Sequence, residues 1–222
     1  MRMCMTRLPM QYAMLLAAGL AAWQPSKAHA ADEDVQFWLV GFVRTNLDDD
    51  VFLTIDVSQR FREPVIGPDQ QTIRLTIEKG LNDRVRLGGG FAVFETNGQT
   101  EFRPHQQFRF SRGGLDLRTR LEQRMFPGAE QTEWRIRQRV QYTHQAVDKI
   151  DLIASAEWFG VMQARDSRRQ TGTEQVRGVV AVALDVGGGF EVQPGYVLWY
   201  STREGRTDGI SHIPQLTLNY KF

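Results

Sequence analysis

Residues 215–222 read QLTLNYKF, and the polarity of this stretch alternates at every position. Leu216, Leu218, Tyr220 and Phe222 fall on one face of an extended strand, and the residues between them are polar. A strand with one apolar face covers either a soluble core or the lipid-facing wall of a barrel. Leu218, Tyr220 and Phe222 also form the aromatic-ended pattern that outer-membrane barrels present to their assembly machinery, so we expect a membrane strand here.

The same alternation recurs upstream in runs of about ten residues, the length that a tilted membrane strand needs. The clearest runs cover residues 51–62, 115–125 and 134–143. After residue 30, no segment holds eighteen consecutive apolar residues, which excludes a transmembrane helix. We therefore predict an all-β fold over residues 31–222, an antiparallel transmembrane β-barrel of about 10–12 strands. Aromatic residues near the expected strand ends predict interfacial girdles: Trp38, Phe61, Tyr142, Trp158, Trp199, Tyr200 and Tyr220.

Turn lengths predict the topology of this barrel. Short polar turns are expected at 46–50, 80–83, 111–114, 147–149 and 185–188. Longer connections are expected at 62–70, 95–101, 126–131, 163–173 and 202–209. Short turns and longer connections alternate along the chain, as short periplasmic turns and longer outer loops do in bacterial barrels. The turns delimit eleven strands, yet single-chain bacterial barrels have an even number, so either one strand is miscounted or the run 35–45 joins the wall unconventionally.

The first thirty residues read as a separate export signal. Arg2 and Arg7 precede the apolar run Ala13–Ala22, and Ala28–Ala30 (AHA) forms an A-x-A cleavage site. We expect residues 1–30 to be a cleaved secretory signal peptide. Cleavage would remove three basic residues and no acidic one, so the formal net charge of +1 would become −2. It would also remove Cys4, the only cysteine, which excludes disulfide and thiol chemistry in the mature chain.

These features predict a location in the outer membrane of a Gram-negative-type cell. The expected partners are outer-membrane lipid, lipopolysaccharide and the β-barrel assembly machinery. The negative mature charge argues against nucleic acid. A soluble periplasmic β-domain is the alternative, because alternation alone does not separate a membrane barrel from a soluble sandwich. The sequence leaves the oligomeric state open.

Four stretches resemble a bacterial family known as domain of unknown function 2490, predicted outer-membrane proteins. They are Asp32–Trp38 (DEDVQFW), Leu121–Arg124 (LEQR) followed by Phe126, Trp134–Arg139 (WRIRQR) and Leu218–Phe222 (LNYKF). The resemblance spans most of the mature chain, and the motifs occur in the family's order. It implies a barrel and an outer-membrane location. It implies no activity, ligand or catalytic residue.

Arginine dominates the polar face of two consecutive strands. The expected lumen-lining residues are Arg118, Arg120, Glu122, Arg124, Arg135, Arg137 and Arg139. Further lumenal positions are expected at Arg74, Arg86, Arg103, Arg109, Arg177, Asp56, Glu78, Asp116, Glu157 and Glu191. Two interpretations stay open: a positive constriction that favours small anions, or ion-pair ladders that brace a narrow lumen. Small barrels are filled with side chains, which favours the ladders, whereas the excess of arginine favours the anion channel.

Catalysis finds little support in the sequence. There is no G-x-S-x-G motif, and the mature histidines His105, His144 and His212 have no informative spacing from Ser155 or Ser201. A lipid-modifying outer-membrane enzyme is therefore retained only as an alternative to a non-enzymatic barrel. We expect no catalytic residue, no cofactor and no metal site.

Overall fold

A computed structural model describes residues 31–222, except 65–66, 168–169, 204 and 206. The expected signal peptide lies outside the described residues. Within them, no helix is long and apolar enough to cross a membrane. The described residues form eleven strands: β1 (Asp32–Asp48), β2 (Val51–Arg62), β3 (Gln70–Gly80), β4 (Val85–Thr96), β5 (Gln99–Arg112), β6 (Leu115–Arg124), β7 (Glu133–Val147), β8 (Ile150–Gln163), β9 (Gly172–Gly187), β10 (Phe190–Ser201) and β11 (Gly209–Lys221).

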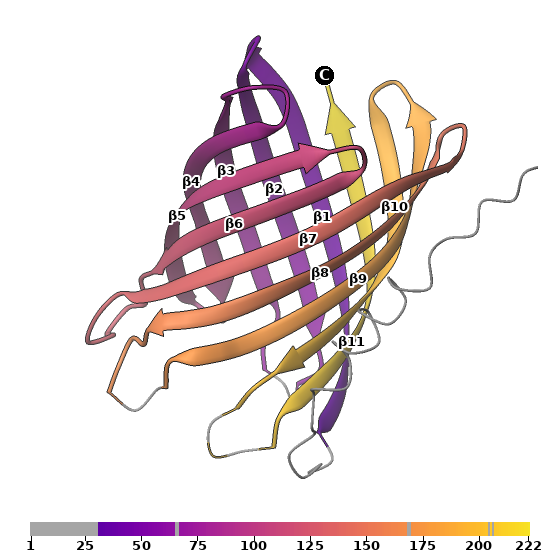
Figure 1. Cartoon of the computed structure of the whole chain (residues 1–222). Helices are drawn as coiled ribbons and strands as arrows, with labels where there is room; N and C mark the ends of the chain where they lie inside the picture. The colour runs from indigo at the N-terminus through magenta and orange to yellow at the C-terminus, as the bar shows by residue number, and fades with distance from the viewer. Residues whose placement is uncertain (1–30, 65–66, 168–169, 204, 206) are drawn as a thin grey trace, which may run out of the picture. The chain divides into compact units, whose positions relative to one another are not determined.

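The eleven strands form one closed barrel, which confirms the predicted fold class (Figure 1). Each strand pairs antiparallel with its neighbours in sequence, and β1 and β11 close the barrel by pairing parallel. An odd number of alternating strands leaves the first and last pointing in the same direction, so the closing pair has to be parallel. The run 35–45 therefore sits fully in the wall, between β2 and β11.

Side chains alternate across the wall, with apolar residues outside and polar residues inside. On β2, Val57 is 47% exposed, whereas its neighbour Asp56 is 8% exposed. The same contrast separates Ile73 from Thr72 on β3. Successive side chains of a strand point to opposite faces of a sheet, so the chain's alternation in polarity becomes an apolar exterior and a polar interior.

One predicted loop is a tight hairpin. The sequence places a longer connection at residues 95–101, but β4 continues to Thr96 and β5 begins at Gln99. Only Asn97 and Gly98 turn the chain, with positive φ angles of 49° and 75°. Asn-Gly is the dipeptide that best adopts the type I′ geometry of a two-residue hairpin. The prediction was wrong because the polar residues around this dipeptide hide the strand ends.

Two of the expected girdle residues point into the barrel. Trp38 is only 2% exposed and packs against Val197 and Ile213, both fully buried. Trp199 belongs to the same cluster, and its ring lies 5.2 Å from the Trp38 ring in an edge-to-face arrangement. The girdle prediction for these two residues was wrong because residues 37–43 of β1 and 196–200 of β10 are apolar or aromatic on both faces, so polarity within these runs does not reveal which face is which.

Candidate functional site

The two arginine rows lie side by side inside the barrel. Strands β6 and β7 pair so that Arg118 lies opposite Arg139, and Arg120 lies opposite Arg137. All six predicted arginines line an interior cavity of about 440 Å³. Glu122 lies opposite Arg135 and is 1% exposed. The structure thus brings the seven predicted lumen residues together on one wall of the interior.

Glu122 is the first centre of an ion-pair network. Its Oε2 accepts hydrogen bonds from Nε and Nη2 of Arg135, at 3.0 and 2.6 Å. Its Oε1 accepts a hydrogen bond from Arg137 Nη1 at 2.7 Å. Arg103 and Arg120 also lie within 4 Å, at 3.8 and 3.9 Å. Four guanidinium groups therefore surround one carboxylate, which is stable in a buried position only because it is so heavily compensated.

Glu157 on β8 is the second centre, and it too is buried. It accepts hydrogen bonds from Arg118 Nη2 at 2.7 Å and from Arg137 Nη2 at 2.8 Å. Arg177 on β9 also donates to Glu157. Arg137 thus bridges Glu122 and Glu157 and links the strands from β6 to β9 through their side chains.

Carboxylates near both ends of the arginine rows complete the network. At one end, Asp116 accepts hydrogen bonds from Arg109 Nε at 2.5 Å and from Arg139 Nη2 at 2.6 Å. At the other end, Arg124 donates to three carboxylates: Glu101 at 2.8 Å, Glu133 at 2.5 Å and Glu174 at 3.3 Å. The wall formed by β5 to β9 is therefore braced along its length by charge-assisted hydrogen bonds.

The cavity nevertheless has a strongly cationic lining. Among the described residues that line it, only Asp56, Glu78 and Glu157 are acidic. The arginines of the lining are Arg44, Arg60, Arg62, Arg74, Arg103, Arg109, Arg118, Arg120, Arg124, Arg135, Arg137, Arg139 and Arg177. Glu101, Glu122, Asp116 and Glu133 are buried outside this lining, so guanidinium groups rather than carboxylates dominate the surface that faces the cavity.

The other predicted lumenal residues divide into two groups. Arg74, Arg103, Arg109 and Arg177 line the cavity. Arg86 does not belong to the lining, and its guanidinium lies 3.5 Å from the centre of the Phe52 ring. Among the acids, Glu191 lies outside the lining, where it accepts a hydrogen bond from Asn219 Nδ2 at 2.8 Å.

The sequence interpretation missed several residues of the interior. Glu101 falls in the predicted loop 95–101 and Glu174 is not among the expected lumenal residues, although both accept hydrogen bonds from Arg124. The sequence held a signal for Glu101. Polar residues stand at every second position from Glu101 through Arg103 and His105 to Gln107, which indicates that the strand β5 already includes Glu101. Arg60 was recognised as polar but not as part of the lumen. It lines the cavity opposite Trp38 on the neighbouring strand.

The three histidines considered for hydrolytic chemistry lie in different parts of the barrel. His105 is 2% exposed, and its Nε2 lies 3.2 Å from Thr76 Oγ1. His212 faces outward and hydrogen-bonds the hydroxyl of Tyr196. His144 is exposed on β7. These three histidines occupy the interior, the outer wall and a strand end, so they do not converge on one nucleophile.

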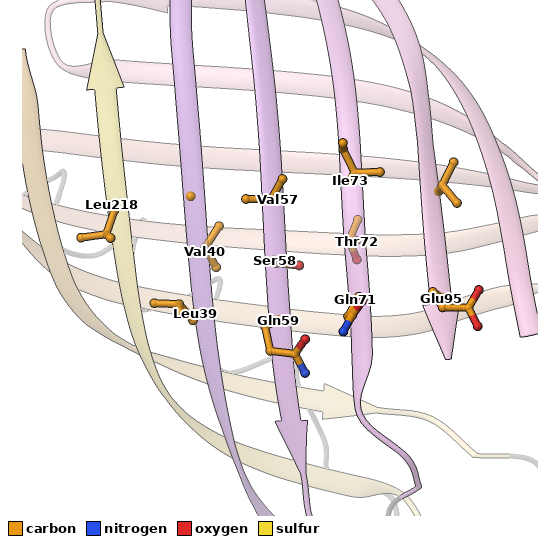
Figure 2. A pocket seen from close by; sticks show the side chains of 12 residues that line it. Leu39, Val40, Val57, Ser58, Gln59, Gln71, Thr72, Ile73, Glu95 and Leu218 are labelled. Atoms are coloured by element: carbon orange, nitrogen blue, oxygen red, sulfur yellow. The ribbon is translucent and has the colours of Figure 1, made fainter. Parts of the chain in front are cut away.

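The outer surface carries a shallow groove across β11, β1, β2, β3 and β4 (Figure 2). Val57, Ile73 and Leu218 form its apolar part. A parallel row is polar, because Gln71 lies opposite Gln59 on β2 and opposite Glu95 on β4. On β2, β3 and β4 the exterior thus changes from apolar to polar within one step along the strands, whereas on β1 the same row continues with the apolar Leu39.

The predicted C-terminal assembly signal lies on the outside of β11. Leu218 and Phe222 are exposed, and the Tyr220 ring lies between those of Phe190 and Phe222, at 4.4 and 5.6 Å. Its role in assembly stays a prediction.

Comparisons with known proteins agree with this geometry. A family model described as "Protein of unknown function (DUF2490)" matches residues 35–209. An uncharacterised protein of Methylorubrum extorquens is 23% identical over 230 residues, with 98% of each chain covered. Among solved structures, the NanC porin superimposes with a TM-score of 0.53 at 8% identity, covering 80% of this chain and 93% of that one. At this identity the likeness concerns the fold alone, and it is to a porin barrel.

Proposed function

Because this chain belongs to the DUF2490 family of proteins of unknown function, we propose a function from its own geometry: a non-enzymatic barrel of the outer membrane that passes small anionic solutes. The observation that carries the proposal is the lining of the interior cavity, in which arginines far outnumber the acidic residues Asp56, Glu78 and Glu157. Rings of arginine or lysine give pores a preference for anions, because a confined cationic surface concentrates them.

The outer-membrane location is supported by the exterior of the barrel. Large apolar residues such as Val57, Ile73 and Leu218 are about half exposed there, and a soluble protein rarely exposes so much contiguous apolar surface. Lipid would cover this surface, and lipopolysaccharide would meet the polar row of Gln59, Gln71 and Glu95. We infer export through the signal peptide at residues 1–30 and insertion by the barrel assembly machinery.

A closed structural barrel is the second candidate, and the ion-pair network favours it. Glu122 and Glu157 hold arginines from β6, β7 and β9 in fixed positions, which would stiffen a narrow barrel whether or not solutes pass. The sequence alternatives of a lipid-modifying enzyme and a soluble periplasmic domain have less support. The histidines do not converge, and the exterior is apolar.

Planar-bilayer recordings test the proposal. The full chain, produced with its export signal and purified in detergent, should give steady conductance, and a KCl gradient should give a reversal potential of the sign expected for chloride preference. Arg44→Gln should reduce the anion preference, because Arg44 lines the cavity and is held by Asn219 rather than by a carboxylate. Lys79→Gln is the matched control, since Lys79 is an exposed cation paired with Asp50.

The recordings also separate the two candidates. A chloride preference that falls in Arg44→Gln and persists in Lys79→Gln would support the channel. Absence of conductance above background, with the barrel folded and in the outer-membrane fraction, would overturn the channel and leave the structural barrel. Recovery of the chain in the soluble periplasm would overturn both.

A further inference from the structure

The cavity has a second wall that is aromatic rather than charged. Trp38 and Trp199 line it from β1 and β10, on either side of the strand β11. Behind them, Val197 and Ile213 are fully buried, so the two indoles rest on a packed support. Phe94 and Phe159 also face the cavity. Inside the barrel, an apolar aromatic surface and the arginine rows of β6 and β7 therefore line the same cavity.

Two arginines lie directly over this aromatic wall. The guanidinium carbon of Arg60 is 4.2 Å from the centre of the Trp38 ring, 5.9 Å from that of Trp199 and 6.0 Å from that of Phe94. The guanidinium carbon of Arg177 lies 5.9 Å from the centre of the Trp38 ring. Cations stacked on aromatic faces are oriented by the ring quadrupole while their edges stay available for hydrogen bonds.

The charge of Arg60 is not neutralised by the protein. Its Nη1 donates to the neutral amide oxygen of Gln70 at 3.0 Å, and no carboxylate among the described residues lies within 4 Å of it. Arg177, Arg62, Arg103 and Arg74 line the same cavity as Arg60, so this lining adds further positive charge. This differs from the ladder on β6 and β7, where every predicted arginine has a carboxylate within 4 Å.

Hydrogen-bond donors remain unused at the same place. Nε of Arg60, Arg62 and Arg177 and Nε1 of Trp199 are buried atoms that have no hydrogen-bond partner among the described residues. Each of these atoms is a donor without acceptor capacity. Buried polar groups are normally satisfied, so unsatisfied donors beside the uncompensated charge of Arg60 call for an acceptor from a ligand.

We propose that Arg60, Arg177, Trp38 and Trp199 form a binding subsite for a small organic anion that carries a carboxylate on an apolar ring. This inference rests on the proposed function and names its solute class. The carboxylate matches the planar guanidinium of Arg60, which has no carboxylate partner among the described residues, and the ligand ring gains contact area on the half-buried Trp199 indole. Trp38 is only 2% exposed and supports Arg60 from below. The cavity of about 440 Å³ falls in the size range of small-molecule pockets. Chloride would be attracted by the positive charge of the arginines but would gain no ring contact with the aromatic wall.

Calorimetric titration of the purified full chain in detergent tests the subsite with three probes. Benzoate carries both a carboxylate and a ring, acetate has no ring, and benzyl alcohol has no charge. We expect benzoate to bind more tightly than either of the other two. Arg60→Gln should weaken benzoate binding by roughly tenfold to a hundredfold, the usual effect of losing a hydrogen bond to a charged group. Arg86→Gln is the matched control, because Arg86 also stacks on an aromatic ring but lies outside the cavity lining.

Equal affinity for acetate and benzoate, or unchanged benzoate binding by Arg60→Gln, would overturn the subsite. The comparison of probes on the unsubstituted chain keeps the test valid if Arg60→Gln does not fold. The test is also separate from that of conduction. Benzoate binding by a barrel without conductance would uphold the subsite and reject solute passage, whereas anion conductance without benzoate binding would do the reverse.

Discussion

Leu39 on the first strand lies beside Leu216 on the last strand, and the two strands run in the same direction. Neighbouring strands are about 4.8 Å apart, which is within the Cα separation that a disulfide spans. In a chain whose only cysteine, Cys4, is replaced by serine, we expect the pair Leu39→Cys and Leu216→Cys to crosslink on oxidation. The crosslinked chain should migrate differently on a denaturing gel without reductant.

The control for this crosslink uses the same partner strand. Ile210 pairs with Glu33, six residues along β1 from Leu39, so cysteines at 39 and 210 are about 20 Å apart and should stay reduced. Efficient crosslinking between 39 and 210, but not between 39 and 216, would mean that the barrel closes in another register.

Removing the carboxylate of Glu122 should destabilise the barrel strongly. Glu122→Gln leaves Arg135 and Arg137 without one of their charge partners in a buried position. Breaking a buried ion pair from one side typically costs about 3–5 kcal/mol. We expect a correspondingly lower urea midpoint for unfolding in detergent or lipid. Glu95→Gln is the control, since Glu95 lies on the outer surface and bonds only Thr100 in the described chain. Equal midpoints for the two variants would show that the network contributes little.

The sequence predicted the wall better than it predicted the interior. Alternation and turn residues were sufficient for the strand number, because the lipid and the lumen impose opposite polarity on successive residues. The parallel closure was not predicted, since the pairing of β1 with β11 joins residues far apart in the chain. The six arginines were found because three share each strand, at alternate positions of β6 and of β7.

The aromatic side of the interior could not be predicted for a different reason. On β1, Val35, Phe37 and Leu39 face outward, whereas Trp38 faces inward. Since residues 37–43 are apolar on both faces, hydropathy does not distinguish the faces within this run. The proximity of Arg60 to Trp38 follows from the pairing of β1 with β2, and the proximity of Arg177 depends on the closure of the whole barrel. Such contacts appear only when the topology is known.

The Asn97–Gly98 hairpin should be sensitive to the residue at 98. Its φ of 75° is a conformation that branched residues adopt only with strain. Gly98→Val should therefore lower the free energy of unfolding by about 1–2 kcal/mol, the typical cost of a left-handed conformation, as measured by urea titration. Gly178→Ala serves as the control, because Gly178 has no positive φ and a Cβ there would meet no atom within 4 Å. If both variants matched the unsubstituted chain, the two-residue turn would be in doubt.

Labelling in intact cells should reveal the orientation of the barrel. The connection from Met125 to Thr132 is one of the longer ones, and Glu130 is exposed in it, whereas Asp49 is exposed in the two-residue turn between β1 and β2. Because bacterial barrels keep short turns in the periplasm and longer loops outside, Glu130→Cys should react with a membrane-impermeant maleimide in intact cells. Asp49→Cys should react only after lysis, and the unsubstituted chain provides the background.

Loop length alone is an incomplete guide to which side of the membrane a connection faces, because the short hairpin at Asn97–Gly98 lies at the same end of the barrel as the longer loops. The reverse labelling pattern would place the Asp116 end of the arginine ladder outside and would overturn the predicted orientation.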